Sequence, residues 1–82
     1  MMDVLYFAWV RERIGHPKDQ VESDAATVRD LVEELRGREE RYAAAFADLG
    51  ALRVAVDQEL ADFDAPLGGV REVAFFPPMT GG

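Results

Sequence analysis

The sequence predicts an α+β fold in which one main helix packs across a mixed β-sheet. Two observations predict it: strand-like segments both precede and follow one amphipathic helix, and turn-forming residues separate these segments. The chain has 82 residues, which fits one domain. A domain of this size buries roughly 60% of the surface that its unfolded chain exposes, so it has no room for a large enclosed active site.

The first strand is expected over residues 2–10, and it is apolar on both of its faces. A strand with one solvent-exposed face should alternate apolar and polar residues, but this segment is apolar at even and odd positions from Val4 onward. Either the domain covers both faces, or one face meets a partner. The odd positions are Asp3, Leu5, Phe7 and Trp9. Residues 11–14 form a charged connection that ends at Gly15-His16-Pro17, and residues 19–23 form a short second strand that pairs with the first.

The main helix is expected to begin after Thr27. Thr27 is the predicted N-cap, and Asp30 three residues later completes an approximate capping box. Gly37 is the predicted stop, at a position that tolerates left-handed backbone. The spacing i, i+3, i+4, i+7 places four apolar residues on one helical face, namely Val28, Leu31, Val32 and Leu35. A weaker helical segment over residues 39–49 groups Tyr42, Ala43 and Phe46.

The second half of the chain returns to strand patterns. Residues 52–57 alternate in strand fashion, Asp57-Gln58 is the predicted hairpin turn, and residues 59–61 form its second arm. Residues 64–69 form a loop, and residues 70–76 form the last strand. The order strand, strand, helix, strands in a short chain predicts the β-grasp, ubiquitin-like architecture. The expected sheet–helix core is Val4, Tyr6, Val28, Leu31, Leu35, Val54, Val56, Val73 and Phe75.

Composition excludes several classes of function. The chain has no cysteine and one histidine, His16, which excludes disulfides, thiolate catalysis and cysteine or histidine metal clusters. No serine or threonine lies near a usable base, and the acidic pairs on the helices are expected to be solvated. The net charge of −7 disfavours nucleic acid and anionic membranes and makes a basic protein partner more plausible. Without a signal-peptide or membrane-spanning pattern, the protein is expected to be cytoplasmic.

The C-terminal segment is the feature that points to chemistry. We expect residues 1–76 to form the β-grasp domain and residues 77–82 to form an extended tail that ends in Gly81-Gly82. Pro77 and Pro78 fix φ near −65° and extend the chain. The six residues after Phe76 could reach roughly 20 Å from the sheet at ~3.3 Å each. Such a tail could enter a partner's active site, where the Gly82 carboxylate would react after activation.

A second functional signal is an excess of apolar residues on one side of the domain. Phe7 on the first strand, Leu60 in a polar hairpin and Phe76 on the last strand are the predicted contact patch. A patch near the root of the tail would orient the tail in its receptor. For Leu5 and Trp9, packing in a second small core explains their positions equally well.

Three segments of the chain resemble the small subunits of molybdopterin synthase. The opening resemblance is Val4-Leu5-Tyr6-Phe7-Ala8 followed by Val10-Arg11-Glu12 and Gly15. The second is Val54-Ala55-Val56-Asp57-Gln58, where that family often has Asn in place of Asp57. The third is Glu72-Val73-Ala74-Phe75-Phe76-Pro77-Pro78 together with Gly81-Gly82. The similarity runs over nearly the full length, and the tail motif is its most specific part.

This resemblance implies a sulfur carrier in molybdenum cofactor biosynthesis that binds no cofactor and is not an enzyme by itself. A ubiquitin-activating-like adenylyltransferase would use ATP to adenylate Gly82, which then becomes a thiocarboxylate. The large synthase subunit would receive the tail in a heterotetramer and transfer the sulfur to cyclic pyranopterin monophosphate. Gly81 and Gly82 would form the reacting end of the tail. Partner contacts would come from the patch and the rest of the tail, namely Phe7, Leu60, Phe76, Pro77, Pro78, Met79 and Thr80.

Two alternatives remain open at this point. One is a carrier that supplies sulfur for thiamine, for cysteine or for transfer-RNA thiolation. The other is a ubiquitin-like modifier that forms isopeptide bonds with lysines of target proteins. All of these proteins need the same adenylation, so a Gly-Gly tail alone does not separate them. The stem Phe75-Phe76-Pro77-Pro78 favours the molybdopterin synthase reading.

Overall fold

The first and last strands of the chain lie side by side at the centre of one sheet. The structure is a computed structural model in which residues 1–78 are described. Along the chain the elements are β1 (Met2–Tyr6), α1 (Ala8–Ile14), β2 (Lys18–Val21), α2 (Val28–Arg36), α3 (Glu40–Ala45), the 3-10 helix η1 (Leu49–Ala51), β3 (Arg53–Val56), β4 (Glu59–Ala61) and β5 (Glu72–Phe76). The strand order is β2-β1-β5-β3-β4, with β1 and β5 parallel and every other pair antiparallel. The predicted mixed sheet and the pairing of the first two strands are confirmed.

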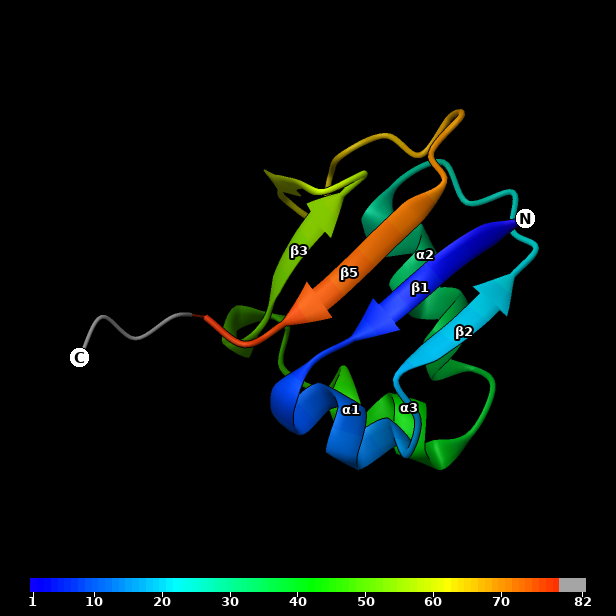
Figure 1. Cartoon of the computed structure of the whole chain (residues 1–82). Coiled ribbons are helices and arrows are strands. Elements are labelled where there is room, and N and C mark those ends of the chain that lie inside the picture. Colours follow the sequence, from blue (N-terminus) through cyan, green and yellow to red (C-terminus); the bar gives the residue numbers. More distant parts are fainter. Residues whose placement is uncertain (79–82) are drawn as a thin grey trace.

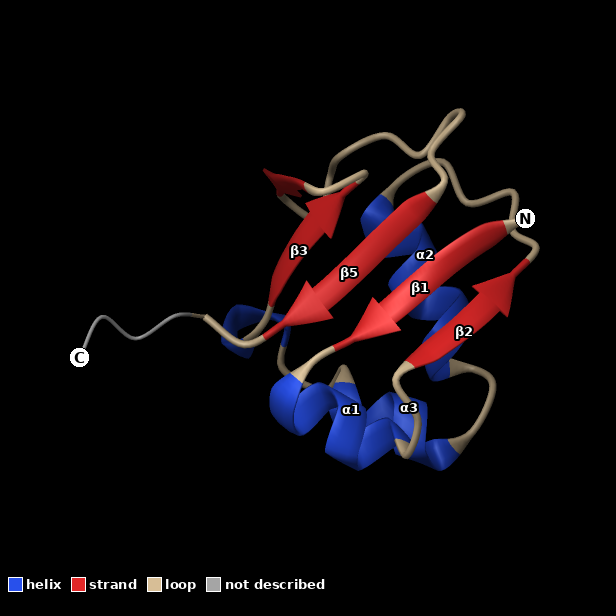
Figure 2. Ribbon diagram, viewed as in Figure 1, coloured by secondary structure: helices blue, strands red, loops and turns tan. Residues whose placement is uncertain are grey.

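Helix α2 crosses one face of this sheet, and the core lies between them (Figures 1 and 2). Helices α1 and α3 close one end of the layer, below the sheet in Figure 1. Eight of the nine predicted core residues are buried, and the exception is Val56, which is half-buried next to the hairpin. The core also takes in residues that were not predicted as core, among them Val10, Ile14, Phe46 and Leu52.

Helix α2 forms where the sequence predicted it. The Thr27 side chain accepts a hydrogen bond from the backbone N–H of Asp30 at 3.3 Å, which satisfies one of the free donors of the first turn. All four residues of the apolar face are buried. The helix stops at Gly37 as predicted, but the backbone there is right-handed and not left-handed, because Gly37 has φ −79°. The N–H of Gly37 instead bonds the carbonyls of Glu33 and Glu34, so right-handed backbone closes the last turn.

The first strand is shorter than predicted, because β1 ends at Tyr6 and residues 8–14 form helix α1. Val10 and Ile14, four residues apart, both turn into the core, which is the helical period. The apolar run from Val4 to Val10 hid the change from strand period to helix period. Trp9 therefore lies on a helix, half-buried against the core, and the Arg13 guanidinium stands over its ring at 5.3 Å. The predicted charged connection at residues 11–14 and the strand position of Trp9 are both wrong.

The second helical segment and the hairpin depend on local backbone geometry. Helix α3 covers only Glu40–Ala45, but Tyr42 and Phe46 are buried together as expected, and Ala43 is half-buried. The Phe46 ring packs edge-on against Phe75, with ring centroids 4.9 Å apart. The predicted hairpin turn is confirmed: Asp57 and Gln58 have φ 49° and 70°, the left-handed pair that a two-residue hairpin requires.

Candidate partner-binding face

The face of the sheet that points away from α2 carries a row of apolar side chains. Residues paired in register point to the same side of a sheet. Leu5 pairs with Ala74, Ala74 with Ala55, and Ala55 with Leu60, so these four form one row across β1, β5, β3 and β4. Side chains alternate between the two faces along each strand: Val4, Val54, Val73 and Phe75, which adjoin the row in sequence, all face α2 and the core. We call this second side the outer face.

Two aromatic residues extend the row toward the end of the sheet where β5 finishes. Phe7 follows β1 with extended backbone, and its N–H continues the ladder by donating to the carbonyl of Phe75 at 3.1 Å. Phe76 ends β5 opposite Arg53 of β3. Among the described residues, the large hydrophobic side chains that are exposed are Met1, Phe7 at 48% and Leu60 at 75%. We define the outer patch as Leu5, Phe7, Ala55, Leu60, Ala74 and Phe76.

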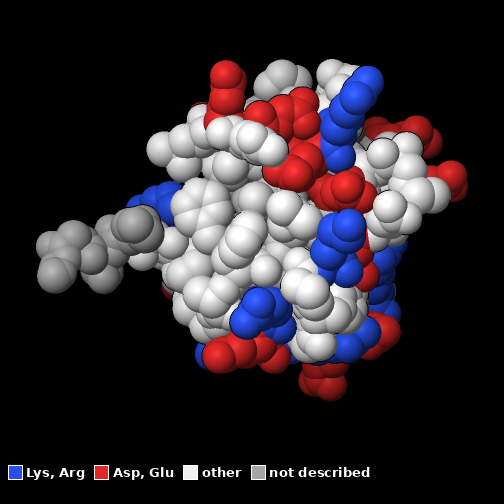
Figure 3. All heavy atoms as spheres, viewed as in Figure 1, with Lys and Arg blue, Asp and Glu red and all other residues white. Residues whose placement is uncertain are grey.

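The other end of the outer face is acidic. Asp3 of β1 and Glu72 of β5 pair directly in register, one step beyond Leu5 and Ala74. Figure 3 views this face and shows uncharged atoms gathered over its centre and toward the C-terminal end, with acidic groups above them. The apolar end is therefore the one from which the chain leaves the sheet.

The segment Pro77-Pro78, called the stem from here on, lies next to the outer patch. Phe76, Pro77 and Pro78 are half-buried, and they follow directly from the central strand β5. The structure thus brings together the predicted contact residues Phe7, Leu60 and Phe76 on one face and places Pro77 and Pro78 at its edge. Met79, Thr80, Gly81 and Gly82 lie outside the described residues, so their predicted roles and the domain boundary after residue 76 stay predictions.

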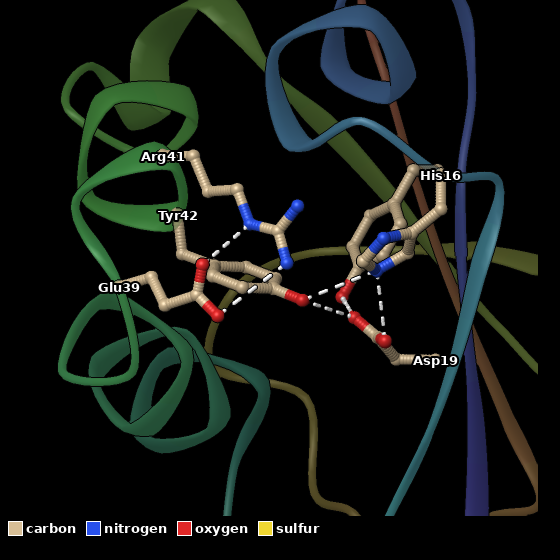
Figure 4. A network of polar contacts seen from close by, with 6 residues as sticks. His16, Asp19, Glu39, Arg41 and Tyr42 are labelled. Carbon is tan, nitrogen blue, oxygen red and sulfur yellow. Dashed lines mark hydrogen bonds and ion pairs between the residues drawn. The ribbon is translucent and has the colours of Figure 1, made fainter.

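Sequence reasoning missed a polar cluster at the end of the sheet closed by α1 and α3. Asp19 of β2 accepts hydrogen bonds at one carboxylate oxygen from Tyr6 (2.8 Å) and Tyr42 (2.7 Å). Its other oxygen lies 2.8 Å from Nε2 of His16, which is 3.2 Å from the Tyr42 hydroxyl (Figure 4). The members come from β1, β2, α3 and the α1–β2 connection. No local sequence motif predicts such a cluster, because most of its members are far apart in the sequence and each of them is an ordinary residue on its own.

The cluster changes the acidity of three of its members. Burial raises the pKa of the Asp19 carboxyl, but hydrogen bonds from Tyr42, His16 and Tyr6 outweigh burial and hold that pKa below its usual value. Burial and the neighbouring Asp19 carboxylate raise the pKa of Tyr6 and of Tyr42. The charged carboxylate and the neutral hydroxyls therefore stabilise one another. Because every side-chain polar atom buried within residues 1–78 has a hydrogen-bond partner, we interpret the cluster as structural.

The remaining acidic candidates lie on the surface. Glu33 pairs with Arg36 on α2, and Glu39, the N-cap of α3, pairs with Arg41; all four residues are exposed. Within residues 1–78, no three histidine or acidic side chains are placed to hold a metal ion. None of the helices in this part of the chain is long and apolar enough to cross a membrane.

The order of elements, the central parallel pair of strands and the helix across one face define a ubiquitin-like β-grasp protein. Solved structures of the same fold support this classification. SAMP1 from Haloferax volcanii has a TM-score of 0.78 at 28% identity, over 99% of this chain and 98% of that one. A putative molybdopterin converting factor, subunit 1, from Pyrococcus furiosus has a TM-score of 0.71 at 27% identity, over 95% and 97%.

Sequence comparison narrows the classification to a family. The profile of the ThiS family matches residues 4–82. The molybdopterin synthase sulfur carrier subunit of Escherichia coli (strain K12) is 46% identical over 82 residues, which cover 100% of both chains. The proteins of the same name from Haemophilus influenzae and Mycobacterium tuberculosis are 40% and 35% identical, over 100% and 99% of this chain and 100% and 96% of theirs. The chain therefore belongs to the ThiS family, as a relative of molybdopterin synthase sulfur carrier subunits, and the resemblance seen in the sequence is confirmed.

Proposed function

We propose that this protein is the sulfur-carrier subunit of a molybdopterin synthase and carries sulfur as a thiocarboxylate on Gly82. The observation that carries the proposal is the full-length match to three carriers of that name, combined with an outer patch at the root of the stem. The match to the E. coli and H. influenzae carriers includes the Gly81-Gly82 end.

The chemistry follows from the weakness of a carboxylate as an electrophile. An ATP-using, ubiquitin-activating-like enzyme would form an acyl-adenylate at Gly82 and release pyrophosphate. Sulfide would then attack the acyl carbon and displace AMP, leaving the thiocarboxylate. In the synthase, this sulfur would pass to cyclic pyranopterin monophosphate. The large subunit would supply the catalytic groups, so this chain is a sulfur donor and not an enzyme by itself.

The described residues would serve docking. The outer patch offers Phe7, Leu60 and Phe76 as apolar contacts, and the stem Pro77-Pro78 would direct the following residues into the large subunit. The acidic end at Asp3 and Glu72 would favour a partner with basic groups there. We further propose a heterotetramer, a large-subunit dimer with one carrier at each end. The expected cytoplasmic location stays a prediction.

The decisive experiment is intact-mass spectrometry. After incubation with the activating enzyme, ATP and a sulfur donor, the mass should rise by the difference between one sulfur and one oxygen atom. Adding the large subunit and the pterin precursor should return the mass to its starting value. Deleting Gly82, or adding an alanine after it, should abolish the shift while melting temperature and large-subunit affinity stay native. Gly81→Ala should react more slowly if the receiving channel is narrow, because a Cβ restricts the backbone.

Gly68→Ala is the matched control for these glycine variants. A Cβ at Gly68 would meet no atom within 4 Å, and this loop glycine is remote from the tail in sequence. It should take up and transfer sulfur as the native chain does. If a chain extended beyond Gly82 still makes molybdopterin without cleavage, the proposal is wrong. If the chain is found conjugated to a lysine of a target protein and no thiocarboxylate is detected, the hypothesis of a ubiquitin-like modifier would replace this proposal.

A further inference from the structure

Ala8 has a backbone conformation that alanine disfavours. Among residues 1–78, three residues other than glycine have positive φ: Ala8 at 52°, and Asp57 and Gln58 in the hairpin turn. The hairpin pair needs this geometry, whereas Ala8 is the first residue of helix α1 and follows the extended Phe7. Left-handed backbone brings the Cβ of an L-residue too close to its carbonyl oxygen. The Ala8 side chain is exposed, so its own burial does not offset this strain.

The residues on both sides of Ala8 are held in place. Phe7 has extended backbone (φ −125°, ψ 155°), and its N–H donates to the carbonyl of Phe75 at 3.1 Å, which ties it to the central strand. The Phe7 carbonyl accepts hydrogen bonds from the N–H groups of Val10 (3.1 Å) and Arg11 (3.4 Å), which open helix α1. Val10 and Ile14 then bury that helix against the core. A strained backbone persists when its surroundings fix it in this way.

The turn at Ala8 determines where the Phe7 side chain lies. Because the chain changes direction only after Phe7, this residue keeps its strand geometry, on the outer face at the end of the sheet where Phe76 also lies. We infer that Ala8 is a positioning residue, whose left-handed backbone turns β1 into α1 within one residue and so holds Phe7 on the outer patch for the partner. This inference rests on the proposed docking of the large subunit on that patch.

A double-mutant cycle tests the inference, with calorimetric titration of each carrier variant into the purified large subunit. Ala8→Val disfavours the left-handed turn, because a β-branched side chain tolerates it poorly, and it should weaken affinity about tenfold, as Phe7→Ala does. Ala8→Gly keeps the turn accessible and should stay within about threefold of native affinity. In the Phe7→Ala background, Ala8→Val should cause no further loss, because both changes remove one contact.

Two controls separate positioning from simple loss of stability. Val32→Ala, in the buried face of α2, should lower the melting temperature at least as much as Ala8→Val and still bind with native affinity when folded. A synthetic chain with D-alanine at position 8 keeps the same atoms but prefers left-handed backbone. It should melt at a higher temperature than the native chain and bind with native affinity.

Native affinity of Ala8→Val, or a full further loss in the Phe7→Ala background, would overturn the inference. If Ala8→Val does not fold, the D-alanine chain decides, because a lower melting temperature than native would show that position 8 is not left-handed. Native affinity of Phe7→Ala would remove the docking role of Phe7 and the inference with it. The mass shift on Gly82 tests sulfur loading without the large subunit, so the proposed function can stand or fall separately.

Discussion

The two faces of the same sheet both carry apolar side chains, but these side chains have opposite surroundings. On the face toward α2, Val4, Val73 and Phe75 are completely buried. On the outer face, Leu60 is 75% exposed, Phe7 is 48% exposed, and Leu5, Ala55 and Phe76 are half-buried. A sheet that needs only one apolar face usually alternates with polar residues. The inner face contributes to stability, and the outer face leaves apolar area exposed, which fits the proposed docking of a partner.

The largest expected effect comes from the inner layer. Leu31→Ala removes a completely buried side chain of α2 and should lower the free energy of unfolding by ~2–5 kcal/mol, as large-to-small core changes do. Thermal unfolding measures this loss. Large-subunit affinity should stay native at a temperature where the variant is folded. An unchanged melting temperature would show that the placement of α2 is wrong.

The second-largest loss of stability is expected in the polar cluster around Asp19. Asp19→Ala removes the acceptor of the Tyr6 and Tyr42 hydroxyls and should lower the free energy of unfolding by about 1–3 kcal/mol at neutral pH. In the native chain, the folded state holds the pKa of Asp19 below its unfolded value of ~3.9. This contribution is therefore present above that unfolded value and is lost as pH falls through the folded pKa.

Chemical unfolding at a series of pH values checks that direction. The stability difference between native and Asp19→Ala should shrink toward zero in acid. The raised pKa values of Tyr6 and Tyr42 act at the other limit, because their contribution is present below an unfolded pKa of about 10 and is lost as pH rises through the folded values. A difference that stays constant throughout the acidic range would contradict the assigned charge state of Asp19.

Substitutions on the outer face should weaken partner binding without changing the free energy of unfolding. Leu60→Ala should weaken the large-subunit complex by ~1–2 kcal/mol, since an exposed apolar anchor becomes buried only on association. Its free energy of unfolding should stay within about 0.5 kcal/mol of native. Glu59→Ala is the matched control, because Glu59 is the exposed neighbour of Leu60 on β4, pairs with Val56 and points to the other side. Calorimetry that finds equal affinities for the two variants would remove Leu60 from the docking surface.

The smallest effect is expected in the hairpin that carries Leu60. Gln58→Gly relieves left-handed backbone that is disfavoured by ~1–2 kcal/mol, offset by ~0.5–1 kcal/mol of added chain entropy. The variant should therefore gain roughly 0.5 kcal/mol in stability, measured by denaturant unfolding, and bind as the native chain does. Gln58→Val should lose stability instead, and a gain for Val would contradict the hairpin geometry.

Much of the fold follows from local sequence signals, and the exceptions have physical reasons. Helix α2 was predictable because its cap and apolar face agree, and the outer patch because Phe7, Leu60 and Phe76 have no place in a single core. Helix α1 was hidden because an apolar segment fits a strand and a helix equally well until tertiary packing selects one. The cluster around Asp19 was missed because its members are brought together only by the fold.

The central position of β5 also determines how the domain responds to a pull on its end. Hydrogen bonds to β1 and β3 hold this strand on both sides, and it runs toward the stem. A force applied at the C-terminal end therefore loads both ladders in shear, so that many hydrogen bonds share the tension instead of breaking one after another. The proposed function would have this end inserted, adenylated and withdrawn repeatedly, and it is attached to a strand that is hydrogen-bonded on both sides.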